Sequence, residues 1–390
     1  MTASDAARLK VRRPERARHP WIFAGEIAGL PDGPQNGDVV RVLDQRGRFF
    51  AMAYLNRRSK IVLRVLSWEE EAIDAQFWRR RLKSAIALRG AIPSAAGRRL
   101  VNAEGDRLPG LIVDSYAGWL VLQMSTLGID KVRETVVGAL YELVAPHGIY
   151  ERSDLPERAL EGLQERTGVL AGDAPPELVE IEEGPARLLV DVVRGQKTGL
   201  FLDQRLNRAA AARYASGKHV ANCFAYTGAF GVHASLGGAS EVLNVDISSE
   251  ACRIAERNLA LNHCVNTSVI EANCFDWLRT ASDAGETFGV VVLDPPAFAR
   301  SRSAFEGALR GYKEINLRAI RMLEPGGVLV TCSCSRPVTR ELFGQMLREA
   351  ARDARRDLQL LEDRGQAPDH PVLLAAPETQ YLKCLILRAA

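Results

Sequence analysis

The strongest constraint on the fold is an alternation of apolar runs and amphipathic segments that begins near Arg187. Two of the runs, VVVLD at 290–294 and GVLVTC at 327–332, are apolar at nearly every position. Parallel strands that are covered by helices on both faces need such continuous apolar sequence. The pattern predicts strands at 188–192, 219–222, 241–246, 267–271, 290–294 and 328–332, with helices between them, notably 227–236 and 249–262. This is a doubly wound α/β domain, which we place at 186–390.

Ligands of doubly wound sheets bind beyond the carboxyl ends of the strands, so the residues that follow each strand are candidates for a site. After the strand at 219–222 the chain runs Asn222-Cys223-Phe224-Ala225-Tyr226-Thr227-Gly228 and turns into a helix. The GxGxxG spacing that brings a dinucleotide pyrophosphate onto a helix N-terminus is missing. The loop therefore favours a ligand without phosphates.

Two further strand ends carry polar residues. Asp246 closes the strand at 241–246 and is positioned to accept hydrogen bonds from a ribose diol. The next strand leads to Asn273 and Cys274, where a side chain and the backbone can reach an adenine edge. An asparagine at this place is equally well explained as the N-cap of the following helix.

The fourth strand ends in Asp294-Pro295-Pro296-Ala297-Phe298, and the fifth delivers Thr331-Cys332-Ser333-Cys334-Ser335 to the same edge. Two prolines after an acidic residue stiffen the backbone and remove two N–H donors. Because this turn closes a buried strand at the ligand edge, we expect it to face a substrate.

The first 185 residues follow different patterns. Residues 1–70 read as closely spaced short strands with Gly and Asp turns, which predicts a small β-barrel. From 71 the period becomes helical, and strand-like and helical segments then alternate, with one helix expected at about 129–143. Prolines and Gly184 break the pattern over 145–185, which we expect to be irregular. We therefore expect a middle α+β domain at 71–185.

Charge and cysteine content indicate which partners and which cellular compartment suit the chain. Residues 1–70 contain 13 Lys and Arg against 8 Asp and Glu, while the whole chain carries +3, so the basic surplus lies at the N-terminus. Such a surplus suits either a solvated surface or a module that contacts phosphates. Seven cysteines, the absence of a secretory signal and no apolar run near 18 residues favour a cytoplasmic protein without a membrane span. A lone CxC pair is a weak zinc signal, so no metal is expected.

The strand-end motifs, in their order along the chain, resemble those of class I S-adenosylmethionine methyltransferases that act on RNA bases. The block QKTGLFLDQRLNR at 196–208 resembles the signature of the bacterial 23S rRNA cytosine-5 methyltransferase family of the RlmI type, and the ending, Asp369-His370-Pro371-Val372 with Tyr381-Leu382-Lys383, is similar to that family's. HPWIFAGEI and GDVVRVLDQRGRFFAMAYLN resemble its N-terminal PUA domain, a small RNA-binding barrel.

The resemblance implies a covalent mechanism. In such enzymes a cysteine thiolate adds to C6 of cytosine, the ring then takes the methyl group at C5, and loss of the C5 proton releases the thiolate. By register the nucleophile is Cys334, although Cys332 would point to the same side of a strand. Asp294 would bind the N3/N4 edge of a flipped cytosine, Pro295 and Pro296 would shape the wall, and Phe298 would stack on the base.

The resemblance also implies S-adenosylmethionine as cofactor and 23S rRNA, or a large-subunit assembly intermediate, as partner. It assigns the cofactor site to a set that includes the strand-end residues above, and substrate contacts to Phe298 and Arg205. Tyr312 and Lys313 follow the Asp-Pro-Pro segment on a helix from which they can contact substrate, although that helix is equally well explained as structural packing. The cofactor set is Gln196, Lys197, Asn222, Phe224, Tyr226, Thr227, Gly228, Asp246, Asn273, Cys274 and Asp294. A homodimer is compatible with the sequence, which does not determine the oligomeric state.

Two other functions remain open on the sequence. Asp-Pro-Pro-aromatic also occurs in methyltransferases that act on guanine N2 or N7, where no thiol is needed. A non-catalytic RNA-binding ribosome-assembly factor would use the N-terminal barrel and would not need an intact Asp246, Asp294 and Cys334.

Overall fold

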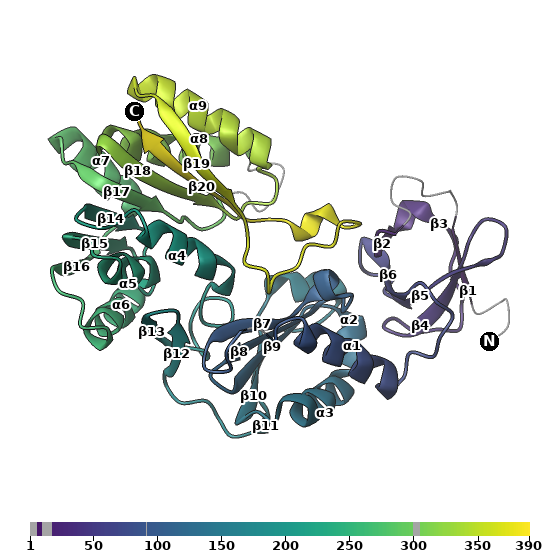
Figure 1. Cartoon of the computed structure of the whole chain (residues 1–390). Coiled ribbons are helices and arrows are strands. Elements are labelled where there is room, and N and C mark those ends of the chain that lie inside the picture. Colours follow the sequence, from purple (N-terminus) through teal and green to yellow (C-terminus); the bar gives the residue numbers. More distant parts are fainter. Residues whose placement is uncertain (1–5, 10–17, 91, 299–304) are drawn as a thin grey trace. The chain divides into compact units, whose positions relative to one another are not determined.

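The computed structural model describes residues 6–9, 18–90, 92–298 and 305–390. These residues form two compact units (Figure 1). The first unit contains the chain up to Val179 together with Val190–Leu202 and Pro368–Thr379. The second contains Glu180–Leu189, Asp203–Ala367 and Gln380–Ala390.

The N-terminal part of the first unit is a strongly curved, barrel-like sheet in the order β2-β6-β5-β4-β1-β3. Its inner face is lined by small and branched side chains such as Val40, Ala53 and Leu63. The predicted small barrel is thus confirmed for the described residues; the basic segment 10–17 lies outside them. The strands are β1 (Ala6–Leu9), β2 (Trp21–Phe23), β3 (Ile27–Gly29), β4 (Val39–Leu43), β5 (Phe49–Leu55) and β6 (Ile61–Ser67).

The middle part of the first unit is a sheet in the order β11-β10-β9-β8-β7 with helices packed on it. Asp74 caps α1 by accepting a hydrogen bond from the Phe77 amide, and Phe77, Trp78 and Leu82 turn inward. The elements are α1 (Ala75–Ala87), β7 (Gly97–Asn102), β8 (Leu111–Tyr116), β9 (Trp119–Met124), α2 (Leu127–Lys131), α3 (Arg133–Val144), β10 (Gly148–Ser153) and β11 (Arg166–Gly172).

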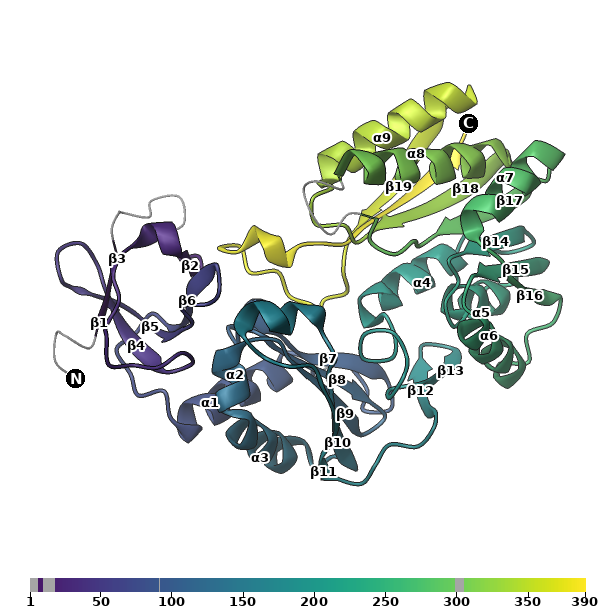
Figure 2. The same ribbon diagram turned by 180° about the vertical axis from the view of Figure 1, so that it is seen from behind.

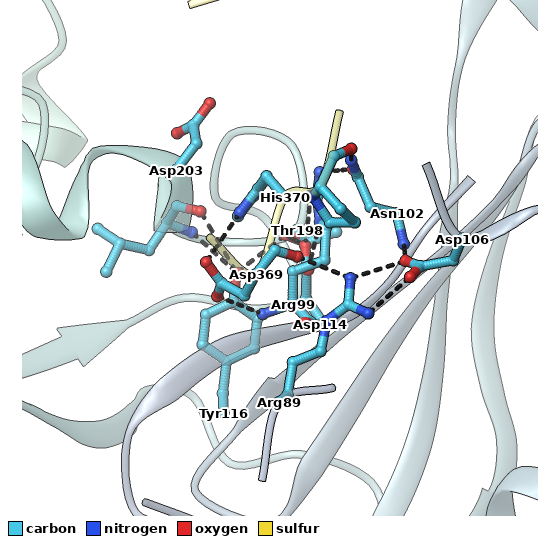
Figure 3. A network of polar contacts seen from close by, with 12 residues as sticks. Arg89, Arg99, Asn102, Asp106, Asp114, Tyr116, Thr198, Asp203, Asp369 and His370 are labelled. Carbon is cyan, nitrogen blue, oxygen red and sulfur yellow. Dashed lines mark hydrogen bonds and ion pairs between the residues drawn. The ribbon is translucent and has the colours of Figure 1, made fainter. Parts of the chain in front are cut away.

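A buried polar network explains why two later segments belong to the first unit (Figure 3). Arg89 forms two bonds to the Asp106 carboxylate, at 2.6 and 2.7 Å, and donates to the Asp369 carbonyl at 2.9 Å. Thr198 Oγ1 donates to Asp114 Oδ2 at 2.7 Å, and Asp114 also pairs with Arg99. These bonds attach 190–202 and 368–379 to the middle sheet.

The second unit is built on one large sheet in the order β16-β15-β14-β17-β18-β20-β19, with β20 antiparallel to both neighbours. The strands are β14 (His219–Cys223), β15 (Glu241–Asp246), β16 (Thr267–Glu271), β17 (Phe288–Leu293), β18 (Leu323–Ser333), β19 (Leu358–Arg364) and β20 (Lys383–Ala389). A separate hairpin pairs β12 (Val179–Glu183) with β13 (Ala186–Val190).

Helices cover both faces of this sheet (Figures 1 and 2). Alternate residues of β17 face opposite ways: Val290 and Val292 pack toward α4 and α5, and Val291 and Leu293 toward α7, α8 and α9. Burial on both faces is the reason that the strand is apolar throughout. The helices are α4 (Arg205–Ala212), α5 (Ala229–Leu236), α6 (Ser249–Leu261), α7 (Cys274–Ala284), α8 (Phe305–Arg321) and α9 (Arg340–Ala354).

The predicted fold class is confirmed, with local corrections. The strand expected at 188–192 is β13, which pairs with β12 outside the large sheet. The region 145–185 is not irregular, because β10, β11 and β12 lie in it. The single helix expected near 129–143 is interrupted at Val132, between α2 and α3. None of the described helices is both long and apolar enough to cross a membrane.

Candidate active site

Four parallel strands, β14, β15, β17 and β18, end at the same edge of the large sheet. Each end carries residues that the sequence singled out: Phe224, Asp246, Asp294 and Cys334 follow or close these strands. A shared edge of parallel strands is where a doubly wound sheet binds its ligand. The second unit therefore brings the principal predicted residues together.

The loop after β14 is held in an unusual backbone conformation. Phe224, Tyr226 and Gly228 have φ angles of +59°, +48° and +76°, in the left-handed region. A Cβ at Gly228 would lie 2.9 Å from that of Ala255, so only glycine fits there without a shift. The turn directs the Tyr226 amide at Asp246, whose Oδ2 accepts that N–H at 2.7 Å.

Asp246 is fixed as a hydrogen-bond acceptor. Besides the Tyr226 amide, the Ser248 amide donates to its Oδ1 at 2.9 Å. Each carboxylate oxygen keeps a further lone pair, and the residue is partly exposed. Nearby, the Thr227 hydroxyl is buried without a hydrogen-bond partner in the part of the chain that the structure describes. An anchored acceptor beside an unsatisfied hydroxyl fits the polar, uncharged face of a nucleoside.

Three of the predicted cofactor residues use their side chains in hydrogen bonds within the protein. Asn222 is buried and donates to Asn244 Oδ1 at 2.9 Å. The Cys274 thiol accepts from the Phe224 amide at 3.1 Å and donates to the Val245 carbonyl at 3.3 Å. The Asn273 side chain accepts from the Phe275 amide at 2.9 Å, so it is the N-cap of α7. Asn222 Oδ1 is buried without a hydrogen-bond partner among the described residues, and the exposed Asn273 keeps its side-chain NH₂ group for a further contact.

Aromatic rings line the edge between β14 and β17. Phe298 packs on Phe275 and Phe224, with ring centroids 5.4 and 6.4 Å apart, and on Tyr312 at 4.5 Å. Phe298 and Phe224 are partly exposed, whereas Tyr312 is fully buried. Pro295 is buried and Pro296 exposed. The stacking surface expected of Phe298 is present, but the direct substrate contact expected of Tyr312 is not available to a buried side chain.

The two cysteines of the TCSCS segment lie in different environments. Cys332 is fully buried in β18 opposite Cys384 of β20. The neighbouring Cys384 thiol and burial raise the pKa of Cys332 well above its usual range. β18 ends at Ser333, so Cys334 lies beyond the strand and is partly exposed. Accessibility thus favours Cys334 as the nucleophile.

A buried lysine lies beside Cys334. Lys383 Nζ donates to the carbonyls of Ser335 and Tyr381, both at 2.8 Å, and the residue is 6% exposed. Burial lowers the pKa of Lys383 to about 8, and interaction with Cys334 opposes this shift. In the sequence, Lys383 stands out only as part of the family-like ending. Because Lys383 and Cys334 are 49 positions apart, no local sequence pattern indicates that they lie close together.

Asp294 lies in an environment that favours its neutral form. Burial and the Asp203 carboxylate raise the pKa of Asp294 to about 7, while a hydrogen bond from Gln204 and the charge of Arg208 oppose this shift. Gln204 Nε2 donates to Asp294 Oδ1 at 2.8 Å. Gln204 was missed as a site residue, although the QKTGLFLDQRLNR block contains it.

Other predicted residues lie elsewhere. Gln196 and Lys197 are exposed and belong to the first unit, so their contact with a cofactor stays a prediction. Arg205 begins α4 in the second unit and is partly exposed. Lys313 of α8 pairs with Asp353 of α9 at 2.7 Å, so its ammonium group has a partner within the protein. No group of three or more metal-ligating side chains is found among the described residues.

Comparison with known proteins identifies relatives of both parts of the chain. Residues 164–388 match the family model of S-adenosylmethionine-dependent methyltransferases, and residues 10–68 match that of PUA-like domains. The chain is 47% identical to the ribosomal RNA large subunit methyltransferase I of Aeromonas salmonicida, over 95% of this chain and 96% of that protein. It is 44% identical to the protein of the same name from Shewanella frigidimarina, over 98% and 99% of the two chains.

The fold is also shared with a solved structure. A Streptococcus mutans protein described as a SAM-dependent methyltransferase superposes with a TM-score of 0.83, covering 98% of this chain and 99% of its own, at 21% identity.

Proposed function

Since the chain belongs to the S-adenosylmethionine-dependent ribosomal RNA large subunit methyltransferase I family, we propose that it forms 5-methylcytosine in 23S rRNA through a covalent adduct of Cys334. The observation that carries the cytosine-C5 assignment is the pair of cysteines at the sheet edge. Cys334 is partly exposed beside the buried cation Lys383, whereas Cys332 is sealed in the sheet. Methylation of an exocyclic amine needs no such thiol.

The cofactor supplies an electrophilic methyl group when it is bound. Asp246, with two backbone amides already fixing its orientation, would accept hydrogen bonds from the ribose hydroxyls. The loop of Phe224, Tyr226 and Gly228 would form the wall beside it, and Thr227 offers an unsatisfied hydroxyl. Gln196 and Lys197 are proposed as further contacts on the resemblance of their block alone.

The chain's own residues divide the chemical work. The Cys334 thiolate adds to C6 of cytosine, which raises the electron density at C5 and makes that carbon the nucleophile. After the methyl group is bound at C5, a water molecule takes up the C5 proton, and the electron pair of the C5–H bond re-forms the C5–C6 double bond while the C6–sulfur bond breaks to return the thiolate. A charged Lys383 favours the thiolate over the thiol. Asp294 would bind the N3/N4 edge, and Phe298 would stack on the flipped base.

The RNA partner is supported by the first unit. The PUA-like domain carries the basic surplus, and its contacts with phosphates would release counterions. Binding of 23S rRNA should therefore weaken steeply as salt concentration rises, and binding that does not change with salt would contradict a phosphate-contacting role.

The test is methyl transfer from labelled S-adenosylmethionine to rRNA from cells that lack the gene, followed by mass spectrometry of the nucleosides. Wild type and Cys332→Ala should form 5-methylcytidine, and Cys334→Ala should form none. A methylguanosine product, or full activity of Cys334→Ala, would replace the proposal by a guanine methyltransferase. Good RNA binding without any transfer would favour an assembly factor.

A further inference from the structure

The side chain of Gln204 connects Asp294 to a line of hydrogen bonds. Gln204 is 2% exposed and ends the short turn that precedes α4. Its Nε2 donates to Asp294 Oδ1 at 2.8 Å, and its Oε1 accepts from Asn207 Nδ2 at 2.6 Å. Asn207, in the first turns of α4, is 1% exposed. The two amides therefore lie in series behind the carboxyl group.

The direction of this line is determined from its far end. Arg364 Nε donates to Asn207 Oδ1 at 2.9 Å, and a guanidinium group can only donate. The Gly365 carbonyl, which can only accept, takes a second bond from Asn207 Nδ2 at 3.1 Å. Asn207 must therefore direct its NH₂ group at Gln204, and Gln204 must direct its own NH₂ group at Asp294.

Arg364 is itself anchored. Its Nη1 lies 2.6 Å from Glu362 Oε2, and its Nη2 donates to the Leu206 carbonyl at 3.1 Å. The four residues Arg364, Asn207, Gln204 and Asp294 thus form one relay in which every N–H points toward the carboxyl group. A rotation of the Gln204 amide by 180° would place two N–H groups, or two oxygens, face to face.

The relay determines which oxygen of Asp294 can carry a proton. Oδ1 accepts the Gln204 N–H, and because a carbonyl oxygen accepts better than a hydroxyl oxygen, this bond favours the neutral form whose proton is on Oδ2. Among the described residues, the charged or titratable groups that interact with Asp294 are Asp203, Arg208 and Cys332. With the pKa of Asp294 raised to about 7, a substantial fraction of the carboxyl group is neutral at pH 7.

A neutral carboxyl group with a fixed proton distinguishes the two pyrimidines. Cytosine presents the acceptor N3 beside the amino donor N4, whereas uracil presents the donor N3–H beside the acceptor O4. A carboxyl group that is free to protonate on either oxygen can match both patterns. One whose donor and acceptor are fixed can match only one of them, and the other pairing leaves like groups facing each other.

We propose that Gln204 is a positioning residue that makes the site selective for cytosine over uracil by confining the proton of Asp294 to Oδ2. In this arrangement Oδ2–H donates to N3, and the second lone pair of Oδ1 accepts from the N4 amino group. The inference rests on the proposed function, because it takes Asp294 as the group that binds the N3/N4 edge.

The test compares two transcripts of the same 23S rRNA region. One carries the cytosine that the wild-type protein methylates, located by mass spectrometry of RNA fragments, and the other carries uracil there. Initial rates of 5-methylcytidine and 5-methyluridine formation give a cytosine-to-uracil ratio of kcat/KM. Gln204→Met keeps the length of the side chain and removes its amide, and should lower this ratio by about tenfold or more. Gln359→Met, on exposed β19, is the matched control and should leave it unchanged.

A second variant, Asn207→Asp, tests the same relay if Gln204→Met does not fold. Asn207→Asp preserves the size and the acceptor for Arg364 but removes the N–H that orients Gln204. It should lower the same ratio, because the Gln204 amide is then free to turn. The pH profile provides an independent readout: the Gln204 bond lowers the pKa of Asp294, so the loss of activity at high pH should move to higher pH in Gln204→Met.

The outcomes separate this inference from the function on which it rests. A wild-type protein that forms no 5-methylcytidine contradicts both. If it forms 5-methylcytidine, and both variants slow the two transcripts equally without shifting the pH profile, Gln204 is structural and only the selectivity role is overturned.

Discussion

Buried charges are treated differently in the middle of the first unit and at the sheet edge of the second. In the first unit, Arg89 and Asp106, each side chain 1% exposed, meet through two bonds of 2.6 and 2.7 Å, and Arg99 meets Asp114 at 2.7 Å. At the sheet edge, Asp294 accepts a hydrogen bond from the Gln204 amide and lies near the Asp203 carboxylate, while the cation that acts on it, Arg208, is itself paired with Glu183. Lys383 donates to two carbonyls.

This difference separates scaffold from site. A buried ion pair whose partners satisfy each other's hydrogen bonds holds segments of the chain together. A buried carboxyl or amine without a counter-ion shifts its pKa toward neutrality, where it can exchange protons at physiological pH. The unpaired carboxyl and amine at the sheet edge of the second unit therefore mark where chemistry can occur, and the paired charges of the first unit mark the scaffold.

The largest effect is expected in the first unit. Asp106→Ala leaves Arg89 buried without its counter-ion and should lower the free energy of unfolding by about 3–5 kcal/mol, measured by urea denaturation. Segment 368–379 should become more susceptible to proteolysis, because Arg89 also binds the Asp369 carbonyl. Glu142→Ala, which breaks an exposed pair with Arg79, is the control and should cost less than about 1 kcal/mol. Equal losses of unfolding free energy in both variants would contradict a scaffold role for the buried Arg89–Asp106 pair.

At the sheet edge, Asp294→Asn should stabilise the protein while abolishing methyl transfer. Because the pKa of Asp294 is raised to about 7, the folded state binds this proton more tightly than the unfolded chain, and wild-type stability is lost as pH rises from about 4 to 7. Asparagine does not titrate. The free energy of unfolding of the variant, relative to wild type, should therefore be on the order of 2 kcal/mol higher at pH 8 than at pH 4, after allowance for partial solvent access. Thermal unfolding at the two pH values, with exposed Asp357→Asn as control, measures the gain; a gain of the same size at pH 4 would show that charge is not its cause.

A smaller effect is expected at Cys334 when its neighbouring cation is removed. Lys383→Met should slow alkylation of Cys334 by iodoacetamide about tenfold at pH 7, because a nearby positive charge favours the reactive thiolate. Lys383→Arg should react nearly as fast as wild type. Peptide mass spectrometry follows Cys334 separately from the other cysteines. Unchanged alkylation in Lys383→Met would show that Lys383 serves only to tie the Ser335 and Tyr381 carbonyls together.

The smallest effect is expected at Lys313. Its ammonium group pairs with Asp353 between α8 and α9, on a solvent-exposed surface. Lys313→Ala should change kcat/KM for rRNA by no more than about twofold, since an exposed ion pair contributes little. A tenfold rise in KM would instead restore the substrate contact that the sequence suggested.

Much of the site was predictable because its backbone positions follow from local sequence. Asp246 and Asp294 stand at strand ends that apolar runs mark clearly, and β15 and β16 were predicted to the residue. The antiparallel strands β19 and β20 were not predicted, and with them Lys383 was missed. β20 pairs with β18, which is remote in the sequence, and β19 joins the sheet only through β20.

The sequence by itself determined the doubly wound sheet, the motifs at its edge and, through its resemblance to known enzymes, the chemistry to expect. Apolar periodicity and strand-end residues act over a few positions, so they can be read along the chain. Only the tertiary structure decided that Cys332 is sealed while Cys334 is accessible, that Tyr312 is buried, and that Gln204 binds Asp294. Burial and the direction of a hydrogen bond depend on residues tens to hundreds of positions apart, and no local pattern encodes them.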